Sequence, residues 1–177
     1  MTERGRSDRD LKFGWAMSTE TDEIRNPGVN FPPPVLFVLT GLCGSAIEAN
    51  VPLPLSTLLM VPGQMFLGLM AVVFGASLLA WALLTLATMK TAIYPNQAAR
   101  ELVAQGPYRF SRNPMYVALT AMTFGIGLLA DNIWILLLLP IALVALTKLV
   151  IQREEHYLAE AFGESYRNYQ LRVRRWL

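Results

Sequence analysis

Long apolar runs without a charged side chain constrain this sequence more than any other feature. Met65–Met89 gives 25 consecutive uncharged positions, and Met115–Ala130 and Asn132–Thr147 give 16 each. A helix of about 17–25 apolar residues spans the hydrocarbon core of a bilayer. The first run is long enough alone, and each shorter run spans if it borrows a flanking residue or the bilayer thins locally. The sequence therefore predicts an all-α, polytopic membrane bundle.

A weaker apolar run lies nearer the N-terminus. Phe31–Ile47 opens with three prolines after its first residue and is followed by Glu48. We interpret Pro34–Ile47 as a short first membrane helix, with an interfacial or re-entrant segment as the alternative. The expected architecture is about four transmembrane helices with a C-terminal cytoplasmic helical extension.

The basic residues predict which way the helices cross. Five Lys or Arg precede the first expected span, four lie between the second and third, and six lie at or beyond the end of the fourth. The opposite-side segments, Glu48–Gln64 and Asp131–Asn132, carry none. Because cytoplasmic loops are enriched in Lys and Arg, both termini are expected in the cytoplasm of a multi-pass protein. The expected location is a bacterial inner membrane. The net charge of +2 then indicates contact with membrane lipids, not with nucleic acid.

Three regions follow along the chain. Residues 1–30 form a polar cytoplasmic leader, and residues 31–89 hold two transmembrane helices. Residues 90–177 are the candidate catalytic region, with a cytoplasmic connection, a transmembrane hairpin, a C-terminal helix and a basic tail. One cysteine and one histidine argue against a cysteine- or histidine-rich metal site, so no metal is expected. The tail is interpreted as a surface anchor through Arg172, Arg174, Arg175 and Trp176.

Helix signals define the hairpin. Asn113 suits an N-cap and Pro114 the first helical position. Asp131–Asn132 predicts a tight polar turn, and the next helix is expected from about Ile133 to Phe162, with Gly163 as its stop. In the helix before this hairpin, small residues at 71 and 75 favour close approach of a neighbouring helix, although ordinary glycine use explains them equally well.

The hairpin brings two distant polar clusters together. Helices rise about 1.5 Å per residue, so residues at equal counts from the turn lie at equal depth. Residue 109 then lies opposite 154, and residue 113 opposite 150. We therefore expect Arg109–Tyr116 and Arg153–Glu155 to meet at the cytoplasmic membrane surface.

The joined cluster has the chemistry to bind S-adenosylmethionine. Arginine binds carboxylates with paired hydrogen bonds, carboxylates accept from a ribose diol or an ammonium, and aromatic faces attract cations. The sequence contains no glycine-rich dinucleotide loop and no P-loop. Helix ends and loops would therefore hold the cofactor.

A family resemblance rests on three ordered blocks. They are GPYRFSRNPMY at 106–116, Arg-Glu-Glu at 153–155 and FGESYRNY at 162–169. These blocks, over about Thr91–Leu177, resemble the isoprenylcysteine carboxyl methyltransferase family, whose wider group includes membrane phospholipid N-methyltransferases. The resemblance implies methyl transfer from S-adenosylmethionine to a lipophilic small-molecule or lipid-linked acceptor at the cytoplasmic face.

The same resemblance implies residue roles. The implied catalytic residues are Arg153, Glu155 and Arg112. The implied cofactor-binding residues are Gly106, Tyr108, Arg112, Asn113, Pro114, Tyr116, Glu154 and Glu155. Asn113 stands where the family often has His and cannot titrate near neutral pH, which argues against a general base at this position. Ala118 stands where Gly is usual, which would narrow the pocket.

Other interpretations remain open. The enzyme alternatives are a phospholipid or amine N-methyltransferase and a sterol-reductase-like enzyme that uses NADPH. A non-catalytic membrane scaffold is the third alternative. Residue by residue, Glu154–Glu155 could be a solvated helix end, the arginines positive-inside anchors, and the tyrosines part of an interfacial aromatic belt.

Overall fold

The computed structural model describes residues 32–56, 62–89 and 102–177, and its regular elements over these ranges are helical. They are α2 (Pro34–Asn50), α4 (Gln64–Thr88), the 3-10 turn η2 (Gly106–Arg109), α5 (Pro114–Leu129), α6 (Ile133–Leu146), the π turn η3 (Thr147–Ile151) and α7 (Gln152–Arg172). The expected all-α class is confirmed. The expected leader, residues 1–30, and residues 90–101 of the connection lie outside the described part.

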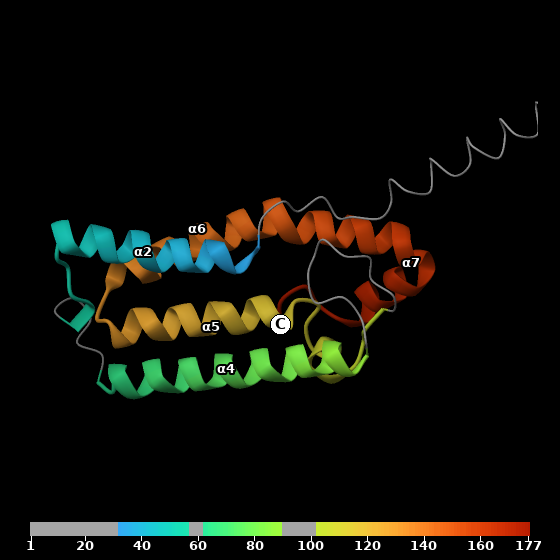
Figure 1. The fold of residues 1–177 in the computed structure, drawn as a ribbon, viewed down its shortest axis with the longest axis horizontal. Coiled ribbons are helices and arrows are strands. Elements are labelled where there is room, and N and C mark those ends of the chain that lie inside the picture. The colour runs from blue at the N-terminus through green and yellow to red at the C-terminus, as the bar shows by residue number, and fades with distance from the viewer. Residues whose placement is uncertain (1–31, 57–61, 90–101) are drawn as a thin grey trace, which may run out of the picture.

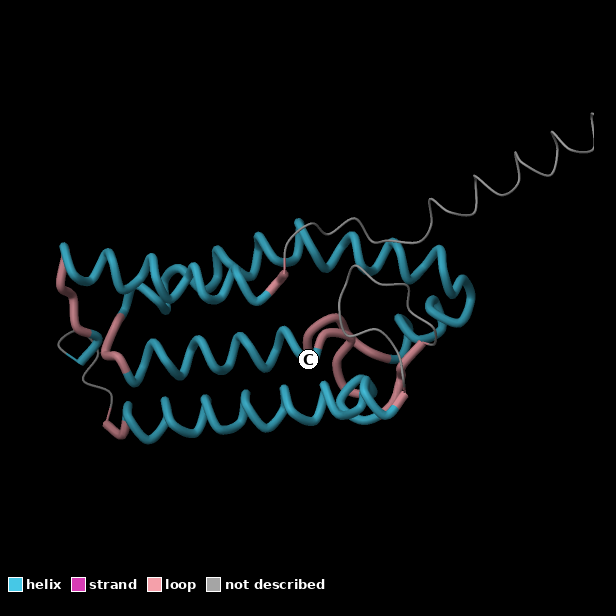
Figure 2. Tube along the Cα trace, viewed as in Figure 1, coloured by secondary structure: helices cyan, strands magenta, loops and turns pink. Residues whose placement is uncertain are grey.

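The helices α2, α4, α5 and α6 lie side by side along the long axis of the molecule (Figures 1 and 2). α2 packs on α6, α4 packs on α5, and α5 joins the two pairs through contacts with both α2 and α6. α7 continues α6 beyond the end of the other helices (Figure 1). The chain then turns back, so that its C-terminus lies beside the start of α5 (Figure 1).

The helices differ in their capacity to cross a membrane. α4, with 25 residues, and the continuous helix Ile133–Arg172 are long and apolar enough, whereas α2 has 17 residues and α5 has 16. The outward face of α4 is apolar, with Phe66 64% and Leu84 65% exposed. A core helix of a soluble protein would bury such side chains, because removing them from water stabilises the fold. This surface fits lipid contact, and two helices meet the length of a span.

Glycine permits the close contact between α4 and α5. A Cβ on Gly75 would lie 2.6 Å from the Ala118 carbonyl oxygen, and one on Gly125 would lie 2.6 Å from the Gly68 carbonyl oxygen. Gly68 and Gly75 are seven residues apart, the spacing of a straight seam between two helices. Gly75 therefore serves close packing as predicted, but its partner in the seam is Gly68, while Ala71 is only half-buried.

The predicted turn between α5 and α6 is confirmed. Asp131 adopts a φ of 51°, and its carboxylate accepts bonds from the Ser56 backbone N–H at 2.7 Å, the Ser56 hydroxyl at 2.6 Å and the Gln64 amide at 3.0 Å. The Asn132 side chain caps α6 by accepting from the Ile135 N–H at 3.2 Å. These bonds hold the hairpin in one register.

Gly163 interrupts the helix that begins at Ile133, as the sequence predicts, but a second helical stretch that was not expected follows it directly. Its φ of 50° and ψ of −123° interrupt the helical geometry, and a second helical stretch continues to Arg172 in a new direction. Glycine adopts a positive φ without the steric cost that a Cβ imposes. The residue therefore redirects the chain toward the bundle.

Replacing Gly75 with alanine should destabilise the protein. Alanine improves helix propensity by about 1 kcal/mol, but overpacking costs about 1–3 kcal/mol. The clash with the Ala118 carbonyl should dominate, because backbone cannot move aside as a flexible side chain can. The measurement is thermal unfolding in detergent.

Gly41→Ala is the matched control for Gly75→Ala. A Cβ on Gly41 in α2 meets no atom within 4 Å, so this variant should be as stable as the parent or more stable. Equal melting temperatures for the two variants would contradict the close α4–α5 seam.

Candidate functional site

The two polar clusters meet where the hairpin predicts. The Tyr116 hydroxyl, in the first turn of α5, donates to Glu154 Oε1 at 2.9 Å. The Arg112 guanidinium, just before α5, lies 2.9 Å from Glu155 Oε1. Residues about 40 positions apart are therefore in direct contact at the open end of the hairpin.

The π turn η3 directs both carboxylates toward the bundle. A π turn rotates less per residue than an α-helix. After five residues in a π turn, the next side chain therefore points about one α-helical residue's rotation behind the direction that it would have in an α-helix. Val150 and Ile151 are consequently both fully buried, although they are adjacent in sequence. Glu154 then comes round to the face that Leu146 occupies in α6. Arg153 is exposed, and its implied catalytic role stays a prediction.

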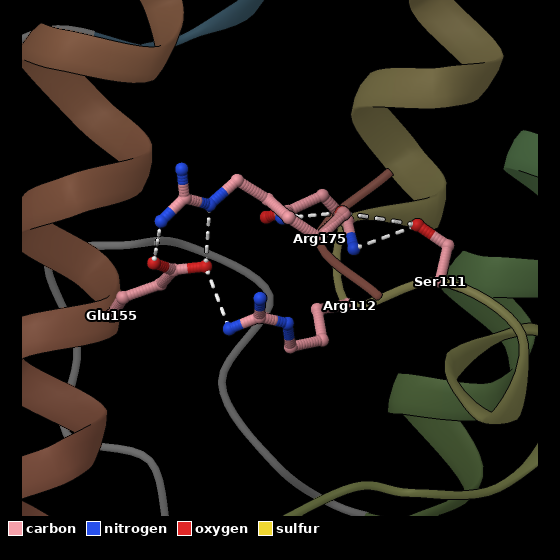
Figure 3. Close-up of polar contacts among 5 residues, drawn as sticks. Ser111, Arg112, Glu155 and Arg175 are labelled. Atoms are coloured by element: carbon pink, nitrogen blue, oxygen red, sulfur yellow. Dashed lines mark hydrogen bonds and ion pairs between the residues drawn. The ribbon is translucent and has the colours of Figure 1, made fainter. Parts of the chain in front are cut away.

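Two arginines share the Glu155 carboxylate (Figure 3). Arg175 donates from Nε to Oε1 at 2.9 Å and from a terminal nitrogen to Oε2 at 2.6 Å, a paired geometry that strengthens charge-assisted bonds. Arg112 reaches Oε1 from the other side. The side chains of Glu155 and Arg112 are 12% and 14% exposed, so little water competes for this ion pair.

Backbone contacts tie the loop before α5 to the C-terminal segment. The Arg112 N–H donates to the Arg174 carbonyl at 2.9 Å, and the Asn113 side-chain amide donates to the Arg175 carbonyl at 3.0 Å. Asn113 occupies the N-cap position, as predicted. Contrary to the prediction, its side chain forms no capping hydrogen bond with α5. Instead the Ser111 hydroxyl accepts the Asn113 N–H at 3.1 Å. The Asn113 side-chain amide instead binds the tail through the Arg175 carbonyl.

Arg175 is the site residue that sequence reasoning missed. We interpreted the tail as a surface anchor, whereas the structure places Arg175 on Glu155 and packs Trp176 against a buried apolar cluster. The chain reaches this position through the bend at Gly163. A glycine ahead of a basic cluster is a weak signal, and nothing in local spacing indicates a partner 20 residues away.

The turn η2 presents Tyr108 to the site. Gly106 adopts a φ of +55° and lies against α4, where a Cβ would come within 2.6 Å of the Thr85 hydroxyl. The Tyr108 carbonyl accepts from the Tyr169 hydroxyl at 2.6 Å, which fixes η2 against α7. Among the described residues, the buried Tyr108 hydroxyl and Arg112 Nε have no hydrogen-bond partner. Buried donors of this kind are costly unless a ligand satisfies them.

The Glu154 carboxyl group has a raised pKa. Glu154 lies beyond the apolar part of the hairpin. Its burial removes the carboxyl from water and raises the pKa of this group from 4.5 to about 7. The negative charge of Glu155 raises this pKa further, while the bond from Tyr116 lowers it. Burial also raises the pKa of the Tyr108 phenol. Glu154 can therefore gain or lose a proton near neutral pH, as groups at functional sites often do.

Stability should fall as pH rises through the range in which Glu154 ionises. Its pKa is raised in the folded state, so the native protein holds more protons than the unfolded chain between about pH 4.5 and 7. The free energy of unfolding should decrease across this range, and Glu154→Gln should reduce the decrease. Denaturant titration in detergent at several pH values measures this free energy of unfolding.

Glu164→Gln provides the control for Glu154→Gln. Glu164 also lies on α7, but its side chain is 81% exposed. This substitution should leave the pH dependence as it is in the parent. An identical pH profile for Glu154→Gln and the parent would contradict the raised pKa.

The chain matches the family model of phospholipid methyltransferases over residues 63–165, more than half of its length. This range includes α4, the hairpin and both carboxylates, and it ends before Arg175.

Two curated relatives match a shorter segment. The nickel-cobalt-cadmium resistance protein NccN of Alcaligenes xylosoxydans xylosoxydans is 34% identical over 64 residues, covering 36% of this chain and 30% of that protein. The cobalt-zinc-cadmium resistance protein CzcN of Cupriavidus metallidurans is 33% identical over 63 residues, covering 36% and 29%. The aligned segment thus spans less than a third of each relative. No solved structure matches the chain.

The family match confirms the family resemblance, and its range includes the first two sequence blocks and the beginning of the third. The matched range contains Arg112, Tyr116, Glu154 and Glu155, the residues that contact one another at the open end of the hairpin. The chain belongs to the phospholipid methyltransferase family.

Proposed function

We propose that this protein transfers a methyl group from S-adenosylmethionine to a lipophilic acceptor at the cytoplasmic membrane face. One observation carries the proposal: Tyr116–Glu154 and Arg112–Glu155 form one cluster at the end of an apolar hairpin. Membership of a methyltransferase family supports it. A polar site next to apolar helices suits a polar methyl donor and an acceptor that arrives through the bilayer.

The donor and acceptor groups of the site fit this cofactor. Tyr108 and Arg112 each hold a buried donor that has no partner in the described structure, which suits the carboxylate or ring acceptors of the cofactor. Glu154, when ionised, suits its positive charge. S-adenosylmethionine supplies a methyl group on a positively charged sulfur, already activated for transfer. Of the other implied residues, Gly106, Asn113 and Pro114 would shape the backbone around it.

The chain's own contribution would be positioning and electrostatics. Arg112 is held by Glu155 and by the tail, so its guanidinium is already oriented before a ligand binds. Tyr116 fixes one oxygen of Glu154. Such preorganisation lowers the cost of arranging charge at the moment of transfer.

Glu154 favours an amine as the acceptor, which is the phospholipid N-methyltransferase alternative. A protonated amine would have to lose a proton before its nitrogen lone pair could take the methyl group, and the carbon–sulfur bond of the donor would break in that transfer with its electron pair left on sulfur. A carboxylate with a pKa of about 7 can take that proton at neutral pH. Asn113 cannot do this, so Glu154 would fill the role of base. A carboxylate acceptor, as in the isoprenylcysteine carboxyl methyltransferases, needs no base, and neither does a thiolate acceptor.

Binding experiments test the proposal against its alternatives. Isothermal titration of the protein in detergent should show saturable binding of S-adenosylmethionine and no binding of NADPH. Binding of NADPH alone would favour a reductase. If folded protein binds neither, the enzyme proposals fail and a non-catalytic scaffold is favoured.

Tyr108→Phe should weaken cofactor binding without loss of stability. Its hydroxyl is buried without a partner in the described structure, so its removal should leave the fold as stable or raise stability by about 1 kcal/mol. If the hydroxyl binds the cofactor, affinity should fall about fivefold to tenfold. Titration and thermal unfolding measure the two effects.

Tyr169→Phe is the matched control for Tyr108→Phe. Its hydroxyl already donates to the Tyr108 carbonyl, so this variant should lose about 1 kcal/mol of stability. Unchanged affinity in Tyr108→Phe would remove its hydroxyl from the proposed site.

We further propose that α2 and α5 also span, which gives four crossings with both termini in the cytoplasm of a bacterial inner membrane. In a Cys43→Ser background, a membrane-impermeant maleimide added to intact cells should label the Val51→Cys variant but not the Leu177→Cys variant. Both positions are exposed, at 53% and 75%, so access decides the result. Labelling of both, or of Leu177→Cys alone, would contradict this topology.

A further inference from the structure

We propose that Arg175 is a positioning residue of the site and that the C-terminal segment, residues 173–177, is one of its walls. The inference rests on the proposed function, because it concerns the same site. It also assigns a role to a segment that lies beyond residues 63–165, the range of the family match. A polar contact, an apolar contact and backbone hydrogen bonds hold the tail in this place.

The polar anchor is the ion pair with Glu155. Arg175 engages both carboxylate oxygens, at 2.9 and 2.6 Å, whereas Arg112 engages Oε1 alone. Two parallel bonds define the plane of a carboxylate, and one bond leaves it free to rotate. Arg175 thus determines the orientation of Glu155 and, through it, that of Arg112 (Figure 3).

The apolar anchor is Trp176. Its side chain packs against a buried cluster formed by α2, α5, α6 and η3, whose members are Phe37, Tyr116, Leu139, Leu146, Val150 and Ile151. Tyr116 is also the donor to Glu154. Adjacent residues of the tail therefore hold the two halves of the site, Arg175 through Glu155 and Trp176 through the cluster behind Tyr116.

The backbone of the tail completes the wall. The Arg174 and Arg175 carbonyls accept bonds from the Arg112 N–H and the Asn113 side chain. Because these bonds join the tail to the loop before α5, loss of the Arg175 side chain should loosen this loop as well as free Glu155. The tail is therefore expected to act on ligand affinity without contacting the reacting atoms.

Arg175→Gln tests the proposal, with Arg175→Lys as the conservative variant and Arg172→Gln as control. Arg172 is an exposed residue of the same basic cluster and donates to the Asn168 carbonyl one turn back. Arg175→Gln should weaken S-adenosylmethionine binding about tenfold. Arg175→Lys should lie between this variant and the parent, because lysine keeps the charge but cannot form the two parallel bonds. Arg172→Gln should bind as the parent does.

Two further measurements separate positioning from a general loss of structure. In a Glu155→Gln background, Arg175→Gln should have little additional effect, since its partner is already altered. In the absence of cofactor, hydrogen exchange of the Arg112 amide should accelerate in Arg175→Gln but not in Arg172→Gln. The double variant reports on the ion pair, and the exchange reports on the loop.

The outcomes are distinguishable from failure of the proposed function. Full affinity in Arg175→Gln, or an equal loss in the Glu155→Gln background, overturns the proposal. If the parent protein does not bind S-adenosylmethionine, the proposed function fails, and amide exchange alone decides the positioning role. Faster exchange in Arg175→Gln alone then supports it, and unchanged exchange overturns it.

Discussion

The Glu155 carboxylate and the two guanidiniums that share it hold the candidate site of this protein together. A charged group this far from water must be paired, because desolvation of an isolated carboxylate costs several kcal/mol. Its two partners come from different parts of the chain, Arg112 before α5 and Arg175 after α7. Satisfying one buried charge therefore requires the hairpin, the loop and the tail to converge.

Neighbouring carboxylates have different environments in this site. Glu155 faces two cations, whereas Glu154 faces the Tyr116 phenol and is buried, with a pKa near 7. Acid and base roles are commonly divided between such pairs when their surroundings differ. In the proposed methyltransferase, Glu155 would be a fixed structural charge and Glu154 the group that responds to ligand or proton. The π turn before them rotates both residues together, and the rotation per residue of α7 gives them different directions.

Much of the architecture could be predicted from local patterns. Charge-free runs indicated the apolar helices, and the turn at Asp131–Asn132 allowed Arg112 and Tyr116 to be placed opposite the carboxylates, because helical rise is constant. Other features of the structure have no local pattern in the sequence. The Gly68–Gly75 seam depends on which face α5 covers, and the exposure of Arg153 depends on a π turn that has no reliable sequence signal.

The sequence by itself determined the helical class, the hairpin register and the meeting of two polar clusters. These follow from hydrophobicity and regular helix geometry, which act within a few residues of each position. Only the tertiary structure decided that Arg175 pairs with Glu155 and that Trp176 packs against the cluster beside the candidate site. Gly163 redirects α7 by adopting a positive φ, and the direction of the returning tail is selected by the buried charge of Glu155 and the apolar cluster behind Tyr116. Such selection depends on groups far apart in sequence, which no local spacing encodes.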